Sequence, residues 1–203
     1  MSAPDLNAAA SAVDLARDVV RQGLAHLATT GSVDADQVIA YDLAHAAAAV
    51  ETARTLLDYG AKGDTEAKIT CAFVADAVAD VATKVYGREA AWGVDPTALD
   101  DARAFVAAYR DPAFLASIDG AGPRHLDDDF ELVQDTFRRF ADDKIRPVAE
   151  HIHRHNADIP EDVIAGLAEI GAFGLSVPEE HGGFAAGGES DYMGMVVATE
   201  ELS

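Results

Sequence analysis

The sequence has 203 residues, of which 49% are hydrophobic and 25% charged, and its formal net charge is −21 at pH 7. Phosphate backbones and acidic lipids attract Lys and Arg clusters, so we expect no binding to nucleic acid or to an anionic membrane. The first residues lack the continuous apolar core of a signal peptide, and no window holds the roughly 18–20 uncharged apolar residues of a membrane span. Cys71 is the single cysteine. An intrachain disulfide is therefore excluded, and a cytoplasmic location is the simplest expectation.

The first part of the chain is rich in alanine and has helical spacing of its apolar residues. This pattern predicts helices over about 6–27, 34–59 and 65–86. Gly60 follows the second segment where a glycine commonly ends a helix, and Asp64 precedes the third as an N-cap. The alanine-rich faces of these segments are typical of helix–helix assembly.

Two Asp-Pro pairs follow, Asp95-Pro96 and Asp111-Pro112. Each combines a capping residue with proline at the first helical position, which predicts helices running to about 109 and about 118. The stretch IDGAGPRHLDDD, residues 118–129, then has two glycines, a proline and no apolar periodicity. We therefore expect a domain junction near residue 122.

The second part begins with a long amphipathic segment that Pro147 should kink or end. A further helix opens at Pro160 and stops at Gly171, and the last one opens at about Asp191 and is still running at Ser203. A native C-terminus seldom falls inside an apolar-periodic helix, so we expect the sequence to continue. The predicted fold class is all-α, with two helical bundle modules, 1–120 and 121–203, joined by a short linker.

The histidine-rich stretch EHIHRH, residues 150–155, is the first candidate for chemistry. On a helix His151 and His155 share a face, which could begin a zinc site, but a third ligand and an ordered second shell would be needed. Glu150 and His153 also fit the Glu-x-x-His pattern of di-iron bundles, whose nearest second copy, 42–45, has Asp in place of Glu. The alternative is a solvated helix end whose imidazoles complement the helix dipole. We assign no metal ligand.

The other candidates are weaker. Cys71 lies one position off the apolar stripe of its helix and is expected to be a buried thiol rather than a nucleophile. The acidic runs 127–129 and 142–143 are typical of solvated faces or a helix start. Gly182-Gly183 and Gly187-Gly188 lack the Lys-Ser/Thr and the preceding strand of a phosphate loop. We therefore expect no catalytic and no cofactor-binding residue in this chain.

From about Asp129 onward the sequence resembles the N-terminal helical domain of the acyl-CoA dehydrogenase family. The resemblance rests on FRRFADDKIRPVAEHIHRHNADIPEDVIAGLAEIGAFGLSVPEEHGG and on DYMGMVVATEELS, whose features come in the family's order and spacing. The positions that match the family's structural motif are Pro147, Pro160, Gly171, Gly174, Pro178, Gly182 and Gly183.

These motif residues have expected roles in the backbone. Gly171 is suited to the left-handed conformation that ends a helix, and Pro178 interrupts any regular element. We expect Gly182 and Gly183 to let the backbone pass close to a neighbouring layer. In the family this domain packs on a central β-domain and helps to wall the acyl pocket, so the resemblance implies that the glycines serve packing rather than chemistry.

The front part resembles, more faintly, helices of the family's C-terminal four-helix domain. The similar stretch begins IAYDLAHAAAAVETARTLLDYG and continues to WGVD. In family members the second of these helices leads to a glycine-rich turn that touches flavin across a subunit contact. Here that place is YGREAAWG, residues 86–93, so a flavin contact is not carried over. Residues 1–120 are interpreted as a helical extension.

The resemblance implies that the full protein is an FAD-dependent enzyme that dehydrogenates acyl-CoA thioesters between the α and β carbons. In the family a glutamate base takes the α-proton and the β-hydrogen leaves as hydride to the flavin. Both the base and the main FAD-binding part are expected beyond Ser203, so this stretch alone should not bind FAD. Neither Glu200 nor Glu201 is proposed as that base. The resemblance also implies an oligomer, and it leaves the acyl chain and the electron-transfer partner open.

Two other interpretations remain. The chain could be a non-catalytic helical subunit that assembles with a dehydrogenase or another partner. It could also be a zinc or di-iron helical bundle, which would bind metal stoichiometrically and lose it when His153 is changed.

Overall fold

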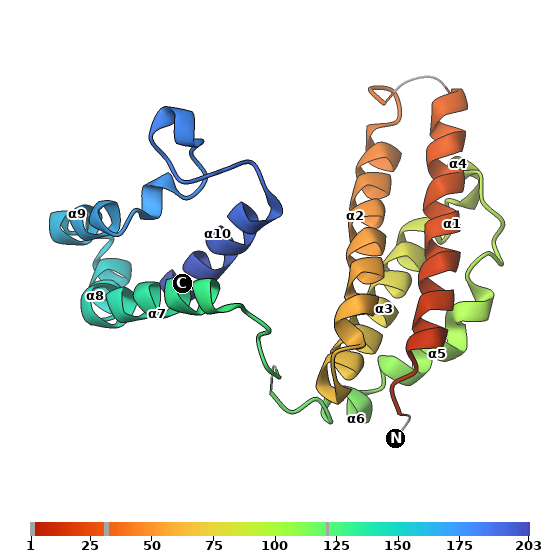
Figure 1. The fold of residues 1–203 in the computed structure, drawn as a ribbon. Helices are drawn as coiled ribbons and strands as arrows, with labels where there is room; N and C mark the ends of the chain where they lie inside the picture. The colour runs from red at the N-terminus through yellow and green to blue at the C-terminus, as the bar shows by residue number, and fades with distance from the viewer. Residues whose placement is uncertain (1–2, 31–32, 121) are drawn as a thin grey trace. The chain divides into compact units, whose positions relative to one another are not determined.

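The computed structural model describes residues 3–30, 33–120 and 122–203. The chain divides into two compact units, Met1–Pro123 and Arg124–Ser203 (Figure 1). The regular elements of the described residues are helices, and the described ranges contain no β-strand beyond an isolated bridge between Pro178 and Ala185. The predicted all-α fold class is confirmed.

The first unit is built on three long antiparallel helices that pack on one another in pairs (Figure 1). They are α1 (Leu6–Thr30), α2 (Gln37–Gly60) and α3 (Asp64–Val85). Shorter helices follow and cover the bundle: α4 (Glu89–Trp92), η1 (Asp100–Ala102), α5 (Arg103–Tyr109) and α6 (Pro112–Leu115). The three long helices predicted for this unit are thus present. Helix α4 was not predicted, because four residues are too few to show a helical period.

The core of this unit closes around Trp92, which α4 places at the end of the bundle with no exposed surface. Gly23 on α1 makes room for it. A Cβ at position 23 would lie 2.7 Å from Leu43 Cδ2 and 3.0 Å from Trp92 Cε3. The glycine is therefore a packing notch inside a helix, where its lower helix propensity is offset by burial of the indole.

Helix α2 ends at Gly60, as expected, and the structure adds a packing reason for this glycine. Gly60 is the last residue of α2 and is buried, and a Cβ there would lie 2.8 Å from both Leu6 Cδ2 and Thr70 Oγ1. The missing side chain lets the end of α2 pack closely against Leu6 of α1 and Thr70 of α3. Asp95-Pro96 opens a turn rather than a helix, because the Asp95 carboxylate accepts the Thr97 backbone N–H at 2.8 Å, and α5 begins only at Arg103.

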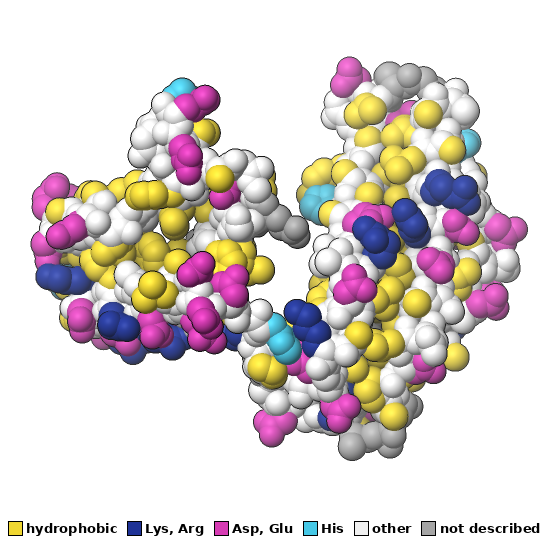
Figure 2. Space-filling model, in the orientation of Figure 1, with side chains coloured by type: hydrophobic (Ala, Val, Ile, Leu, Met, Phe, Trp, Pro, Cys, Tyr) yellow, Lys and Arg dark blue, Asp and Glu magenta, His cyan; other side chains and the backbone are white. Residues whose placement is uncertain are grey.

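The second unit consists of shorter helices joined by turns. Its elements are α7 (Asp128–Phe140), a π-helical turn η2 (Ala141–Ile145), α8 (Arg146–His155), α9 (Glu161–Glu169), η3 (Ala172–Gly174), η4 (Glu179–His181) and α10 (Glu189–Leu202). Helix α7 packs against α10. Asp127 caps α7 by accepting the Phe130 N–H at 2.9 Å, so the acidic run is a helix start. Hydrophobic side chains reach the surface of this unit (Figure 2).

Pro147 changes the helix as predicted, by a mechanism that the sequence did not specify. Helix α7 ends at Phe140, the π-helical turn follows, and Pro147 is the second residue of α8. Proline is tolerated in a first helical turn because its missing N–H needs no partner there. The wider turn before it separates two helical segments that would otherwise form one.

Within the described ranges, no helix combines the length and the apolar character that crossing a membrane requires.

Candidate functional site

The turn between α9 and α10 contains most of the motif residues that the sequence singled out. Gly171 and Gly182 have positive φ angles of 80° and 83°. The Phe184 N–H donates to the Gly174 carbonyl at 2.9 Å, and the Ala185 N–H donates to the Val177 carbonyl at 3.0 Å. These bonds close residues 174–185 into a loop whose two ends lie side by side. Pro178 stands at the start of η4 inside it, and Pro160 precedes α9 in the same extended conformation.

Phe184 explains two of the glycines. A Cβ on Gly171 would lie 2.7 Å from Phe184 Cε2, and one on Gly174 would lie 2.9 Å from the same ring. The ring therefore lies over the backbone of both glycines, and a side chain at either position would displace it. Sequence reasoning assigned no role to Phe184, and the only signal was an aromatic residue following a glycine pair.

Gly183 is required inside the turn itself. A Cβ at this position would collide with the carbonyl group and Cβ of Val177, whereas Gly182 has no described atom within 4 Å of its own Cβ position. The close neighbour of Gly183 is thus a residue of its own loop. Gly182 instead has a positive φ angle, which favours glycine at that position.

Asp191 fixes the exit of the turn into α10. Its carboxylate accepts the backbone N–H of Gly187 at 2.7 Å, of Gly188 at 3.0 Å and of Ala186 at 3.3 Å. The bonds from Gly187 and Gly188 lower the pKa of Asp191 below its ordinary value. A hollow of about 380 Å³ opens beside it, lined also by Pro178 and Tyr192. The carboxylate occupies the N–H donors that an anion would need there.

A charged network joins α7, α10 and the start of the second unit. Arg138 donates two hydrogen bonds of 2.9 Å to Glu201, and Arg124 reaches Glu200 at 2.9 Å and Glu201 at 3.2 Å. The side chain of Glu201 is only 11% exposed. Hydrogen bonding to Arg138 lowers the pKa of Glu201. This arrangement is that of a structural ion pair rather than of a base.

The remaining candidates are engaged elsewhere. The rings of His151 and His155 stack at 4.5 Å, and Glu150 pairs with Arg154 at 2.7 Å instead of joining a ligand set. Asp42 pairs with Arg88 at 2.7 Å. Cys71 is fully buried, as predicted, and burial raises the pKa of its thiol.

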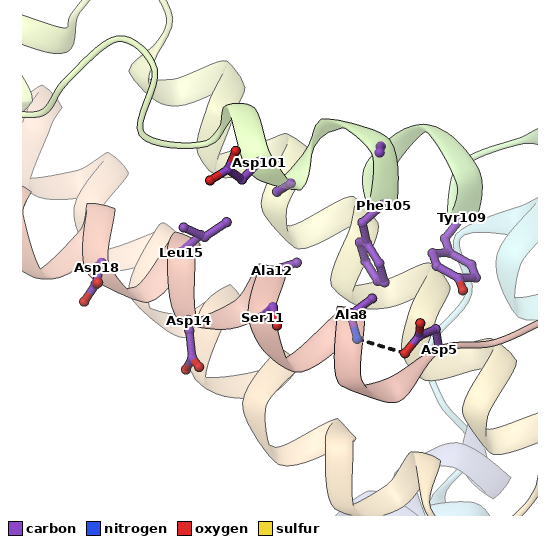
Figure 3. A pocket seen from close by; sticks show the side chains of 12 residues that line it. Asp5, Ala8, Ser11, Ala12, Asp14, Leu15, Asp18, Asp101, Phe105 and Tyr109 are labelled. Atoms are coloured by element: carbon purple, nitrogen blue, oxygen red, sulfur yellow. Dashed lines mark hydrogen bonds between the residues drawn. The ribbon is translucent and has the colours of Figure 1, made fainter.

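A hollow of about 640 Å³ lies on the first unit, between α1 and α5 (Figure 3). Its floor includes Ala12, Leu15 and Phe105, and its charged side chains are aspartates. An FAD pyrophosphate needs cations or free N–H donors. Neither this acidic hollow nor the one beside Asp191 offers them, so neither of these two hollows fits the cofactor.

Comparison with known proteins identifies the domain type of the second unit. Residues 127–203 match the family model described as acyl-CoA dehydrogenase, N-terminal domain. Residues 127–203, which lie in the second unit, therefore match the N-terminal domain of the acyl-CoA dehydrogenase family.

Three relatives illustrate the match. A (2S)-methylsuccinyl-CoA dehydrogenase of Cereibacter sphaeroides is 43% identical over 98 residues, which are 48% of this chain and 17% of the relative. A 3-(aryl)acrylate reductase of Clostridium sporogenes is 33% identical over 73 residues, 36% of this chain and 18% of the relative. A glutaryl-CoA dehydrogenase of Desulfococcus multivorans is 29% identical over 79 residues, 39% of this chain and 20% of the relative. The matched stretches thus span a fifth or less of each of these relatives.

The first relative differs from the other two in length. Its 98 matched residues at 17% give a protein of about 580 residues, whereas 73 residues at 18% and 79 at 20% give about 400. Since 127–203 comprises 77 positions, at least 21 of the 98 matched residues precede Asp127. Similarity to the long relative therefore reaches beyond the family domain toward the first unit.

Proposed function

We propose that these 203 residues are the N-terminal part of a flavin-dependent acyl-CoA dehydrogenase that introduces an α,β double bond into an acyl-CoA thioester. The observation that carries this proposal is the family match over 127–203. The catalytic part lies outside the chain in this proposal, and no residue described here is given a role in the chemistry.

The surface of the second unit supports a continuation. Several of its large apolar side chains are more than half exposed, among them Phe173, Phe184 and Tyr192 (Figure 2). Large exposed apolar side chains are typical of a surface that another protein layer covers. A further domain of the same protein is the proposed cover.

FAD is the proposed cofactor of the full protein, where it would accept the hydride removed from the substrate. The hollows between α1 and α5 and beside Asp191 do not suit its pyrophosphate, because one is acidic and the other has its N–H donors occupied. Its binding residues are therefore proposed to lie beyond Ser203, and the 203-residue chain should purify without flavin.

The substrate proposal comes from the relatives. The names of two of them specify methylsuccinyl-CoA and glutaryl-CoA, thioesters whose acyl group keeps a free carboxylate at its far end. The first of these has the highest identity of the three relatives described and also matches residues before Asp127. We place a short acyl-CoA with a second carboxylate, branched as in methylsuccinyl-CoA, first among the substrates.

Residues 1–120 are proposed to be an extension related to the family's C-terminal helical domain. The helical bundle of the first unit and the upstream similarity to the long relative support this. Oligomerisation and an electron-transfer partner are expected from the family and belong to the same proposal.

The test is to express the complete coding sequence and measure its flavin absorbance. Dehydrogenation of methylsuccinyl-CoA, glutaryl-CoA and butyryl-CoA would then be followed with an artificial electron acceptor. We expect a yellow protein that prefers the two carboxylated substrates. A preference for butyryl-CoA would overturn the substrate class alone. A reading frame that stops at Ser203 and yields a flavin-free protein would overturn the proposal that this is part of an enzyme, and it would favour a helical partner subunit.

A further inference from the structure

The hollow between α1 and α5, called here the acidic groove, has an apolar floor made largely of small side chains. Ala8, Ala12 and Leu15 come from α1, and Phe105 comes from α5 (Figure 3). Phe105 is 8% exposed and Ala12 is 2% exposed, so the floor is buried apolar surface. Alanines along a groove allow the backbone of another helix to approach closely. The shape and the composition both suit an additional helix.

The charges of the acidic groove have one sign. Asp5, Asp14, Asp18 and Asp101 line it, and neither Lys nor Arg does. Asp5 accepts the Ala8 N–H at 2.9 Å, and Asp18 pairs with Arg21 at 3.0 Å. No ion pair or hydrogen bond of the Asp14 or Asp101 side chain occurs within the described residues. These two carboxylates are therefore available to cations from outside.

The arginines near the acidic groove form ion pairs with other carboxylates. Arg103, two residues after Asp101, pairs with Asp100 at 2.9 Å, and Arg17 pairs with Glu51 at 3.4 Å. The second hollow along α1, on its α2 side, is lined by Arg17, Arg21 and Glu51 as well as Asp18. That hollow neutralises its own charges, whereas the acidic groove does not. The charge pattern thus distinguishes two grooves that share one helix.

We propose that the acidic groove binds an amphipathic helix of a partner protein, with apolar residues on the floor and Lys or Arg facing Asp14 and Asp101. From Asp5 to Asp18 the groove follows 13 residues of α1, or about 20 Å at 1.5 Å per residue. A partner helix of about four turns fills that length. Its cations complement a rim that lacks its own.

The test uses the chain 1–203 and a fluorescein-labelled 15-residue helical peptide with leucines on one face and lysines on both sides of that face. Binding is measured by fluorescence anisotropy at physiological salt, which screens long-range attraction to this acidic protein. The variant D14N/D101N should weaken binding about three- to tenfold, because two rim contacts are lost. The control D58N/D143N removes the same charge from exposed positions outside the groove and should change binding less than about twofold.

A second pair of variants tests the shape of the groove without changing charge. Ala104 is exposed and lines the groove, so A104W should fill it and weaken the peptide about tenfold. Ala44 is exposed on α2, and A44W should leave binding unchanged. Far-UV circular dichroism checks that each variant is folded. Equal weakening by both double variants, equal binding of a glutamate-for-lysine peptide, or full affinity of A104W would each overturn the proposal.

Discussion

The two units of this chain bury hydrophobic side chains to very different extents. Among the described residues, 24 buried hydrophobic side chains belong to Met1–Pro123 and four to Arg124–Ser203. The four are Phe137, Val163, Val197 and Ala198. Burial of apolar surface is the main favourable contribution to folding. The first unit therefore contains its own core, whereas the second has little more than one helix–helix contact.

Directional contacts take a larger share in the second unit. The loop closed by Phe184 and Ala185, the Asp191 cap and the Arg138–Glu201 pair hold its helices in place. Such contacts define geometry, but each contributes only about 1 kcal/mol net. The comparison teaches that the second unit is ordered in detail yet has a small core, which agrees with the proposal that a further domain covers it.

The largest expected effect comes from separating the two units. Residues 1–123 alone should unfold in one cooperative thermal transition, because the buried cluster around Trp92 stays intact. Residues 124–203 alone should show a broad transition and bind the dye ANS, because their apolar face lacks a cover. Calorimetry and ANS fluorescence make the measurement. A sharp transition of the second piece, with no dye binding, would remove the contrast between the units.

Much of the fold could be predicted from the sequence, because apolar spacing defines long helices directly. The bounds of α1, α2 and α3 follow from that spacing to within a few residues. The end of α2 at Gly60 was predicted correctly, but the contact of this glycine with Thr70 was not, because a helix-ending glycine and a packing glycine look alike in sequence. The helix predicted to begin at Asp95-Pro96 does not form there, because a local hydrogen bond between Asp95 and Thr97 competes with helix formation.

Within the candidate site, the glycines were visible in the sequence and their partners were not. Contacts of Gly183 with Val177, and of Gly171 with Phe184, depend on how the turn closes. The acidic groove was also invisible, since it joins Asp14 and Asp101 from helices that lie far apart in the chain. Tertiary proximity of this kind leaves no periodic signal.

A smaller effect is expected from filling the turn of the second unit. Gly183→Ala should destabilise this unit by about 2 kcal/mol, since the new Cβ meets the Val177 backbone and the turn must open. Gly188→Ala is the matched control, because its Cβ would meet only Ser190 Oγ at 3.5 Å. Urea unfolding followed by the NMR signals of Val197 and Ala198 reports on this unit alone. Equal stability of the two variants would mean that the turn contributes little to the second unit.

The smallest effect concerns pH and the Arg138–Glu201 pair. The pKa of Glu201 is lowered in the folded chain, chiefly by its hydrogen bond to Arg138, from an ordinary value of 4.5. A lowered folded pKa adds stability that is fully present above the ordinary value and is lost as the pH falls through the folded value. Glu201→Gln should therefore cost the second unit about 1 kcal/mol at pH 7, and the difference should shrink at pH values below 4.5. Glu150→Gln removes a pair whose glutamate is 77% exposed and should change the same NMR-detected unfolding by only a few tenths of a kcal/mol. If both variants behave alike at every pH, the partly buried pair stabilises the second unit no more than an ordinary surface ion pair does. Apolar packing would then be the main contribution that holds α10 against α7.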